Sequence, residues 1–110
     1  EIAKGSSTGV TIYNDEVPVL ARAKELAEQN IIPGGTHKNH KWLAPDIDYA
    51  DNISKIDQLI LCDAVTSGGL LISVPEAEAD ALQRDLQSSG VHSSIIGEVT
   101  EDNAGRIKVI

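Results

Sequence analysis

The chain has 110 residues, of which 41% are hydrophobic and 24% are charged, and its formal net charge is −8. This length and composition predict one globular domain and exclude a disordered chain. No stretch approaches the roughly 20 apolar residues of a membrane helix, and the negative charge disfavours nucleic acid and acidic membranes as partners.

The cysteine and methionine content leads to two further expectations. Cys62 is the only cysteine, so no internal disulfide can form, and we expect the reducing environment of the cytoplasm. The chain contains no methionine and begins at Glu1, and we therefore interpret it as a piece of a longer protein.

The first 30 residues predict a lead-in, a strand and a helix. Residues 1–8 show no periodicity and are expected to be a flexible lead-in to a domain over residues 9–110. Apolar and β-branched residues favour a strand within 9–15. Apolar residues at helical spacing then predict a helix over 16–30, with Pro18 in its first turn.

The middle of the chain predicts a long loop. Residues 30–57 contain two prolines and a Gly-Gly pair but no strong periodicity, and we expect only a turn or two of helix, within 47–58. Leu59–Leu61 fits either the end of a short helix or the start of a strand. The apolar run Leu70–Val74 predicts a buried strand.

The last part of the chain predicts one helix and two strands. Residues 75–90 have an apolar stripe at helical spacing, with Gly90 suited to the C-terminal cap. Residues 92–99 and 106–110 read as strands joined by a turn. The order β-α-loop-β-α-β-β predicts an α+β fold, a single sheet with helices packed on it in a split β-α-β-like arrangement.

Two glycine-rich segments, Pro33–Asn39 and Thr66–Gly69, are candidate anion sites. Glycine lets the backbone approach a ligand closely, and successive N–H groups in such a turn can hold an anion. The alternative for each segment alone is an ordinary turn. The candidate site residues are Gly34, Gly35, Thr36, Asn39, Thr66, Ser67, Gly68 and Gly69.

Metal binding and nucleophilic catalysis are less well supported. His37, His40, Cys62 and Asp63 could be assembled into a metal site, but their loose spacing is not that of a structural zinc site, and we expect no metal. Ser67 lacks the Gly-x-Ser-x-Gly context of a hydrolase nucleophile. Cys62 follows an apolar run, where a thiol is usually part of the core.

The two glycine segments taken together point to a known family. The order NIIPGGTHKNHKW, then LILCDAVTSGGLLISVP, then an amphipathic helix resembles the C-terminal region of selenophosphate synthetase (selenide, water dikinase) from about Tyr13 to the end. Ala64 and Val65 stand where that family usually has Pro-Gln, and the glycines of both segments are intact. The resemblance implies the C-terminal domain fold of the aminoimidazole ribonucleotide synthetase superfamily.

The resemblance also implies a function for a longer parent protein. That family uses ATP, Mg²⁺, selenide and water to make selenophosphate, and it releases AMP and phosphate. Its reactive residues lie in an N-terminal domain, and Cys62 does not correspond to the reactive cysteine. The eight candidate residues would therefore form the phosphate-facing wall of the ATP cleft. The fragment would be inactive alone and would not bind ATP tightly. Its partners would be its own N-terminal domain and a second subunit in a homodimer.

Two alternatives remain open at this stage. The chain could be the C-terminal domain of another member of the same superfamily, although the Pro-Gly-Gly-Thr-x-x-Asn segment favours the selenium enzyme. It could instead be a stand-alone regulatory or interaction module with a split β-α-β fold and no catalysis.

Overall fold

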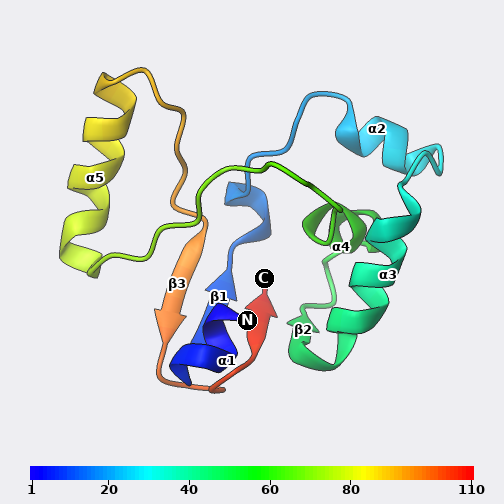
Figure 1. Cartoon of the computed structure of the whole chain (residues 1–110), viewed down its shortest axis with the longest axis horizontal. Coiled ribbons are helices and arrows are strands. Elements are labelled where there is room, and N and C mark those ends of the chain that lie inside the picture. Colours follow the sequence, from blue (N-terminus) through cyan, green and yellow to red (C-terminus); the bar gives the residue numbers. More distant parts are fainter.

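The sheet of this protein contains four strands in the order β2-β4-β1-β3 (Figure 1). The computed structural model describes all 110 residues. The strands are β1 (Gly9–Ile12), β2 (Ile47–Tyr49), β3 (Gly97–Thr100) and β4 (Ile107–Val109). β4 runs parallel to both β1 and β2, whereas β3 runs antiparallel to β1. The predicted α+β class with a single sheet is therefore confirmed.

In Figure 1, α2, α3 and α4 are grouped at the β2 end of the sheet, α5 lies beyond β3 at the other end, and α1 lies beside β1. α4 contacts both α2 and α3. None of the helices has the length and apolar character needed to cross a membrane. The helices are α1 (Ile2–Ser6), α2 (Ala23–Glu28), α3 (Gly34–Leu43), α4 (Lys55–Leu61) and α5 (Glu76–Ser88), with short 3₁₀ turns η1 (Asn14–Glu16) and η2 (Ala44–Asp46).

The core is small and lies between the sheet and the α2–α4 group. Val109 of the internal strand β4 is only 1% exposed. No residue of α5 is buried. The buried residues are Ala3, Gly9, Ala27, Thr36, Ile53, Leu59, Cys62 and Val109. The α5 region is therefore joined to the rest of the domain mainly through the chain itself.

The first eight residues are not an unstructured lead-in. They contain α1, whose Ala3 is buried and whose Lys4 forms an ion pair of 2.6 Å with Asp46. The carbonyl of Thr8 accepts a hydrogen bond from the N–H of Gly105. The prediction failed because these contacts are with residues far away in the sequence, which a local periodicity cannot reveal.

The helix expected over 16–30 is much shorter in the structure. α2 begins only at Ala23, and residues 17–22 are not helical. Arg22, which precedes it, has the left-handed φ of 68° and therefore interrupts any helix that would begin at Pro18. Leu20 is exposed, so the apolar spacing did not reflect one buried face.

The long loop expected over 30–57 is largely helical. α3 occupies Gly34–Leu43, so the first glycine segment is the beginning of a helix and not a turn. The sequence did not indicate this helix for two reasons. Its first turn contains two glycines, which lower helix propensity, and Thr36 is its only buried residue, so it has no apolar stripe. β2 was also missed. α4 agrees with the turn or two of helix that was expected, and it settles Leu59–Leu61 as helical.

The strand expected at Leu70–Val74 does not form. Residues 66–74 take part in no backbone hydrogen bond, either as donors or as acceptors, and Leu70 is 91% exposed. A strand needs a partner to accept and donate its backbone hydrogen bonds, and residues 70–74 pair with none of the four strands. The apolar composition was correctly recognised, but the pairing that would make it a strand is absent.

The C-terminal elements agree with the sequence. α5 matches the helix predicted over 75–90, and Gly90 follows it with a left-handed φ of 77°. The N–H of Gly90 bonds to the carbonyl of Gln87, and the N–H of Val91 bonds to that of Leu86, which is the expected glycine cap. β3 lies at the C-terminal end of the strand predicted over 92–99. β4 lies in the centre of the strand predicted over 106–110.

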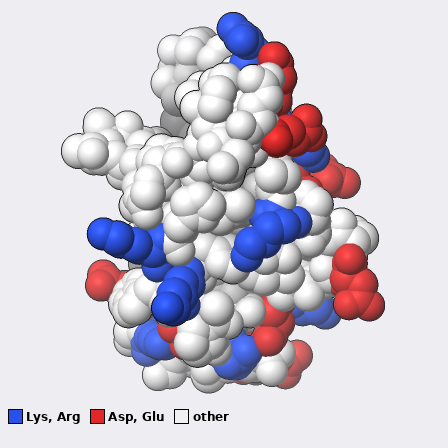
Figure 2. All heavy atoms as spheres, turned by 90° about the vertical axis from the view of Figure 1, so that its right-hand side faces the viewer, with Lys and Arg blue, Asp and Glu red and all other residues white.

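The charged side chains are unevenly distributed. Figure 2 shows the side of the molecule that carries α2 and α3 in Figure 1, and here Lys and Arg side chains spread over the middle of the face. The Asp and Glu side chains in this view lie mostly along one edge. A chain with a net charge of −8 therefore has a locally basic face.

Candidate functional site

The first glycine segment forms the N-terminus of α3. Pro33 precedes the helix and provides no side-chain cap. The N–H groups of Gly34 and Gly35 find no acceptor in the protein. Unpaired N–H groups at the positive end of a helix dipole favour an anion. This part of the candidate site therefore has the donors that a phosphate group needs.

Thr36 and Asn39 make side-chain hydrogen bonds to the residues that follow α4. Thr36 is 1% exposed, and its Oγ1 donates a 2.7 Å hydrogen bond to Oδ1 of Asp63. The same oxygen accepts a 3.3 Å hydrogen bond from the N–H of Ala64. Nδ2 of Asn39 donates to the carbonyl of Cys62 at 3.2 Å. These two side chains hold α3 against the chain that leaves α4, through the hydroxyl of Thr36 and the amide nitrogen of Asn39.

The second glycine segment, Thr66–Gly69, follows the residues that Thr36 and Asn39 hold, and it is exposed. The hydroxyls of Thr66 and Ser67 make no hydrogen bond with the protein, and neither do the backbone N–H groups of the segment. The structure thus brings the start of α3 together with Asp63 and Ala64, immediately before the second segment. Both segments offer free donors, one from a helix terminus and the other from an extended loop.

Three of the four glycines are not required by the packing of this chain. A Cβ atom added to Gly34 or Gly69 would meet nothing within 4 Å, and at Gly68 the nearest atom would be Cγ1 of Val65 at 3.5 Å. None of them has a positive φ. Only Gly35 is needed for close packing, because its Cβ would lie 2.9 Å from that of Ala64. The other glycines leave open space beside their backbones.

The four residues considered for a metal site do not come together. No three His, Cys, Asp or Glu side chains in the structure lie close enough to hold a metal ion. Cys62 is 3% exposed, whereas His37 is exposed on α3. The carboxylate of Asp63 is bonded to Thr36.

Cys62 belongs to a packed polar contact in the core. Its Sγ lies 3.6 Å from the hydroxyl oxygen of Tyr49. Burial, and then the neighbouring thiol, raise the pKa of Tyr49 above its ordinary value. The Tyr49 ring in turn stacks on His40, with ring centroids 6.2 Å apart. A thiol enclosed in this way is not available as a nucleophile.

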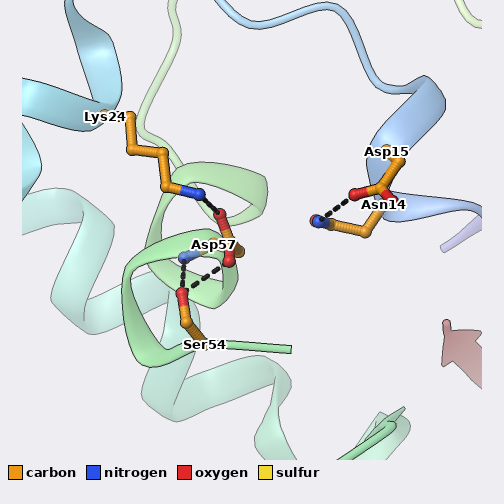
Figure 3. A network of polar contacts seen from close by, with 5 residues as sticks. All are labelled: Asn14, Asp15, Lys24, Ser54 and Asp57. Carbon is orange, nitrogen blue, oxygen red and sulfur yellow. Dashed lines mark hydrogen bonds and ion pairs between the residues drawn. The ribbon is translucent and has the colours of Figure 1, made fainter. Parts of the chain in front are cut away.

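A pocket that the sequence did not indicate lies between η1, α2 and α4. It has a volume of about 450 Å³ and is lined by polar residues such as Asn14 and Asp15 and by apolar ones such as Leu20 and Ile60. Figure 3 shows Asn14 and Asp15 facing the Lys24 and Asp57 pair across this region. The pocket shares no lining residue with the two glycine segments.

The polar wall of this pocket stabilises α4. Ser54 caps the helix by accepting a hydrogen bond from the N–H of Asp57, and its hydroxyl donates to the Asp57 carboxylate (Figure 3). Nζ of Lys24 lies 3.0 Å from that carboxylate and so joins α2 to α4. Ser54 and then Lys24 lower the pKa of Asp57. The Ser-x-x-Asp spacing is the sequence signal that could have located this cap.

Known proteins with similar sequences share one description. The chain is 39% identical over its whole length to "Selenide, water dikinase" of Clostridioides difficile and 38% identical to "Selenide, water dikinase 2" of Peptoclostridium acidaminophilum. It is also 39% identical, over 86% of its length, to "Selenide, water dikinase" of Aliarcobacter butzleri. The chain spans only 32%, 32% and 28% of these three proteins, respectively.

The family comparison covers the complete chain. Residues 1–110 match the family described as "AIR synthase related protein, C-terminal domain". The mixed sheet with its surrounding helices is in keeping with the superfamily expected from the two glycine segments. The chain is therefore a member of the AIR synthase related protein family and represents its C-terminal domain.

Proposed function

We propose that this chain is the C-terminal domain of an enzyme that makes selenophosphate from selenide, ATP and water and releases AMP and phosphate. The similarity over the whole chain to proteins named selenide, water dikinase supports this proposal. In the same proposal the missing two thirds of the relatives' length contribute an N-terminal domain with the reactive groups, and the complete enzyme is a cytoplasmic homodimer. This chain alone is inactive.

We further propose that the start of α3 and Thr66–Gly69 form the phosphate-facing wall of the ATP cleft. The observation that carries this is the combination of free N–H groups at Gly34 and Gly35 with glycines that have no packing role at positions 34, 68 and 69. Such glycines leave room for a ligand to approach the backbone. Thr36 and Asn39 support the wall from behind through their bonds to Asp63 and Cys62.

The residues of this wall fit a phosphate group but not its metal ion. Backbone N–H groups and hydroxyls are donors, and phosphoryl transfer depends mainly on positioning and on stabilising negative charge. No cluster of carboxylates lies beside them. The ligands of the Mg²⁺ that accompanies ATP would therefore come from the rest of the longer protein.

The test uses the complete enzyme with valine at single glycines. Gly69→Val and Gly34→Val should reduce selenide-dependent ATP turnover by about tenfold or more, because the added side chains occupy the space left for phosphate. Gly5→Val is the matched control, since a Cβ there also meets nothing within 4 Å and Gly5 lies in α1. Normal turnover in both site variants would exclude the phosphate wall.

A second measurement separates this function from that of a stand-alone module. Calorimetry with ATP and the 110-residue chain should give no binding in the micromolar range, because half of the proposed cleft is missing. Tight ATP binding by the chain alone would contradict the proposal.

A further inference from the structure

The outward face of α3 carries a cluster of cations on an acidic protein. We define the basic α3 surface as His37, Lys38, Lys41 and Trp42 of α3 together with Lys55 at the start of α4. All five residues are exposed. Positions 37, 38, 41 and 42 share one side of a helix with 3.6 residues per turn, opposite the buried Thr36.

The lysines of this surface are not neutralised within the protein. The four ion pairs of the structure are formed by Lys4, Arg22, Lys24 and Arg106, and none involves Lys38, Lys41 or Lys55. Nζ of Lys55 instead lies 3.0 Å from Nε2 of His40. Residues 29–45 contain no Asp or Glu at all, in a chain that has 17 of them. The positive charge of this surface is therefore left for an external group.

Trp42 adds an apolar element to the same surface. It is the only tryptophan of the chain, and its side chain is 69% exposed one helical turn after Lys38. Exposing an indole to water is unfavourable, and tryptophan is among the residues enriched at protein interfaces. The dipole of α3 explains a cation such as Lys41 in the last turn, but it explains neither Lys38 nor the exposed indole.

The shape and charge of the surroundings favour a short protein segment over nucleic acid. α3 has 10 residues and is about 15 Å long, which matches about five residues of extended chain. The neighbouring α2 carries Glu25 and Glu28, and the chain as a whole has a charge of −8, which repels a long phosphate backbone. The surface also contains no arginine, the residue that binds phosphate through paired donors.

We propose that the basic α3 surface binds an acidic peptide segment of a partner protein, with carboxylates at Lys38 and Lys41 and an apolar side chain over Trp42. This inference concerns an interaction surface and goes beyond the proposed function. The glycines of the phosphate wall lie at the N-terminus of α3, whereas Lys41 and Trp42 lie in its last turn. Loss of one site therefore leaves the other intact.

The test titrates the 110-residue chain with a short synthetic peptide that alternates glutamate and leucine. Trp42 emission should shift to the blue as the indole leaves water, and the affinity should fall as salt is added. Lys38→Glu combined with Lys41→Glu should weaken binding by about tenfold or more, because like charges then face the peptide. Lys38→Gln combined with Lys41→Gln should weaken it less. Circular dichroism verifies that both variants are folded.

The matched control is Arg84→Glu combined with Lys108→Glu, which changes the net charge by the same amount. Both residues are exposed and in no ion pair, but they lie in α5 and β4. Equal weakening by this control pair would overturn the proposal, because it would show an effect of net charge alone. So would the absence of a Trp42 shift. Tighter binding of a single-stranded RNA oligonucleotide than of the peptide would assign the surface to nucleic acid instead. Self-association that disappears in the Lys38/Lys41 variant would assign it to a second copy of the chain.

Discussion

The hydroxyl of Thr36 and the carboxylate of Asp63, separated by 27 residues in sequence, are joined by a 2.7 Å hydrogen bond that connects the first glycine segment to the chain that leads to the second. The same hydroxyl accepts from the N–H of Ala64. A single, almost fully buried oxygen thus positions the chain that leads to Thr66–Gly69 against the N-terminus of α3.

Replacing Thr36 with valine should therefore destabilise the domain. Valine has nearly the same shape but leaves the N–H of Ala64 without its acceptor, and an unsatisfied group of this kind costs about 1–3 kcal/mol. Urea unfolding followed by circular dichroism measures the loss. Thr36→Ser retains the hydroxyl and should be less damaging. Equal stability of Thr36→Val and the unmodified chain would show that the bond is not important for the fold.

Alanine at the two glycines of α3 should have opposite effects on stability. Gly34→Ala should raise the free energy of unfolding by up to about 1 kcal/mol, because alanine reduces the entropy of the unfolded chain and meets no obstacle. Gly35→Ala should lower it, since the new Cβ lies 2.9 Å from that of Ala64. Overpacking of this kind typically costs about 1–3 kcal/mol. Thermal unfolding of the pair under identical conditions makes the comparison, and a Gly35→Ala variant as stable as Gly34→Ala would refute the close contact.

The cap of α4 should make stability depend on acidic pH. The folded-state pKa of Asp57 lies below its ordinary value, so the native state binds fewer protons than the unfolded state near that pH. Its contribution is complete above the unfolded-state pKa, near 3.8, and disappears as the pH falls through the lower folded-state pKa. Urea unfolding from neutral to acidic pH should show this loss, and Asp57→Asn should reduce it.

The capping hydroxyl itself offers a separate measurement. Ser54→Ala should cost about 1 kcal/mol at neutral pH, as expected for an N-cap residue. Ser73→Ala is a suitable control, because Ser73 makes no hydrogen bond and is exposed. If both serine variants unfold at the same urea concentration as the unmodified chain, Ser54 does not cap α4 in solution.

Hydrogen exchange should identify residues 66–74 as the least protected internal segment. None of their N–H groups is hydrogen-bonded, so they should exchange at nearly the rate of an unfolded peptide. The N–H of Ile110, which bonds to the carbonyl of Ile12, should exchange much more slowly. Mass spectrometry of peptic fragments resolves the two regions. Strong protection of 66–74 would mean that the segment pairs with another strand in solution.

The sequence predicted best what depends on local signals. α5 and its Gly90 cap could be recognised because apolar spacing and glycine chemistry act within a few residues. The family could also be recognised, because it depended on two motifs and their order. Local reasoning failed where distant contacts decide, as at α1, which is held by the Lys4–Asp46 pair.

The candidate site can be judged from the sequence only by residue type, because a sequence does not say which polar groups are already hydrogen-bonded. The phosphate role of the eight residues stays a prediction. In the structure the Thr36 hydroxyl bonds to Asp63, and the amide nitrogen of Asn39 bonds to the carbonyl of Cys62. The sequence shows that Lys38 and Lys41 are present, but not that both are exposed on one face of a helix. Their exposure on one face together with Trp42 depends on α3, a helix that the sequence did not indicate because it begins with two glycines.

The position of β4 has a consequence for how the chain is made. This strand lies between β1 and β2 although it comes last in the sequence, and Val10 pairs with Ile107 across nearly the whole chain (Figure 1). A nascent chain that lacks residues 107–109 has two strands with nothing between them. The sheet therefore cannot be completed during translation until these residues have left the ribosome, and closing so long a loop slows folding.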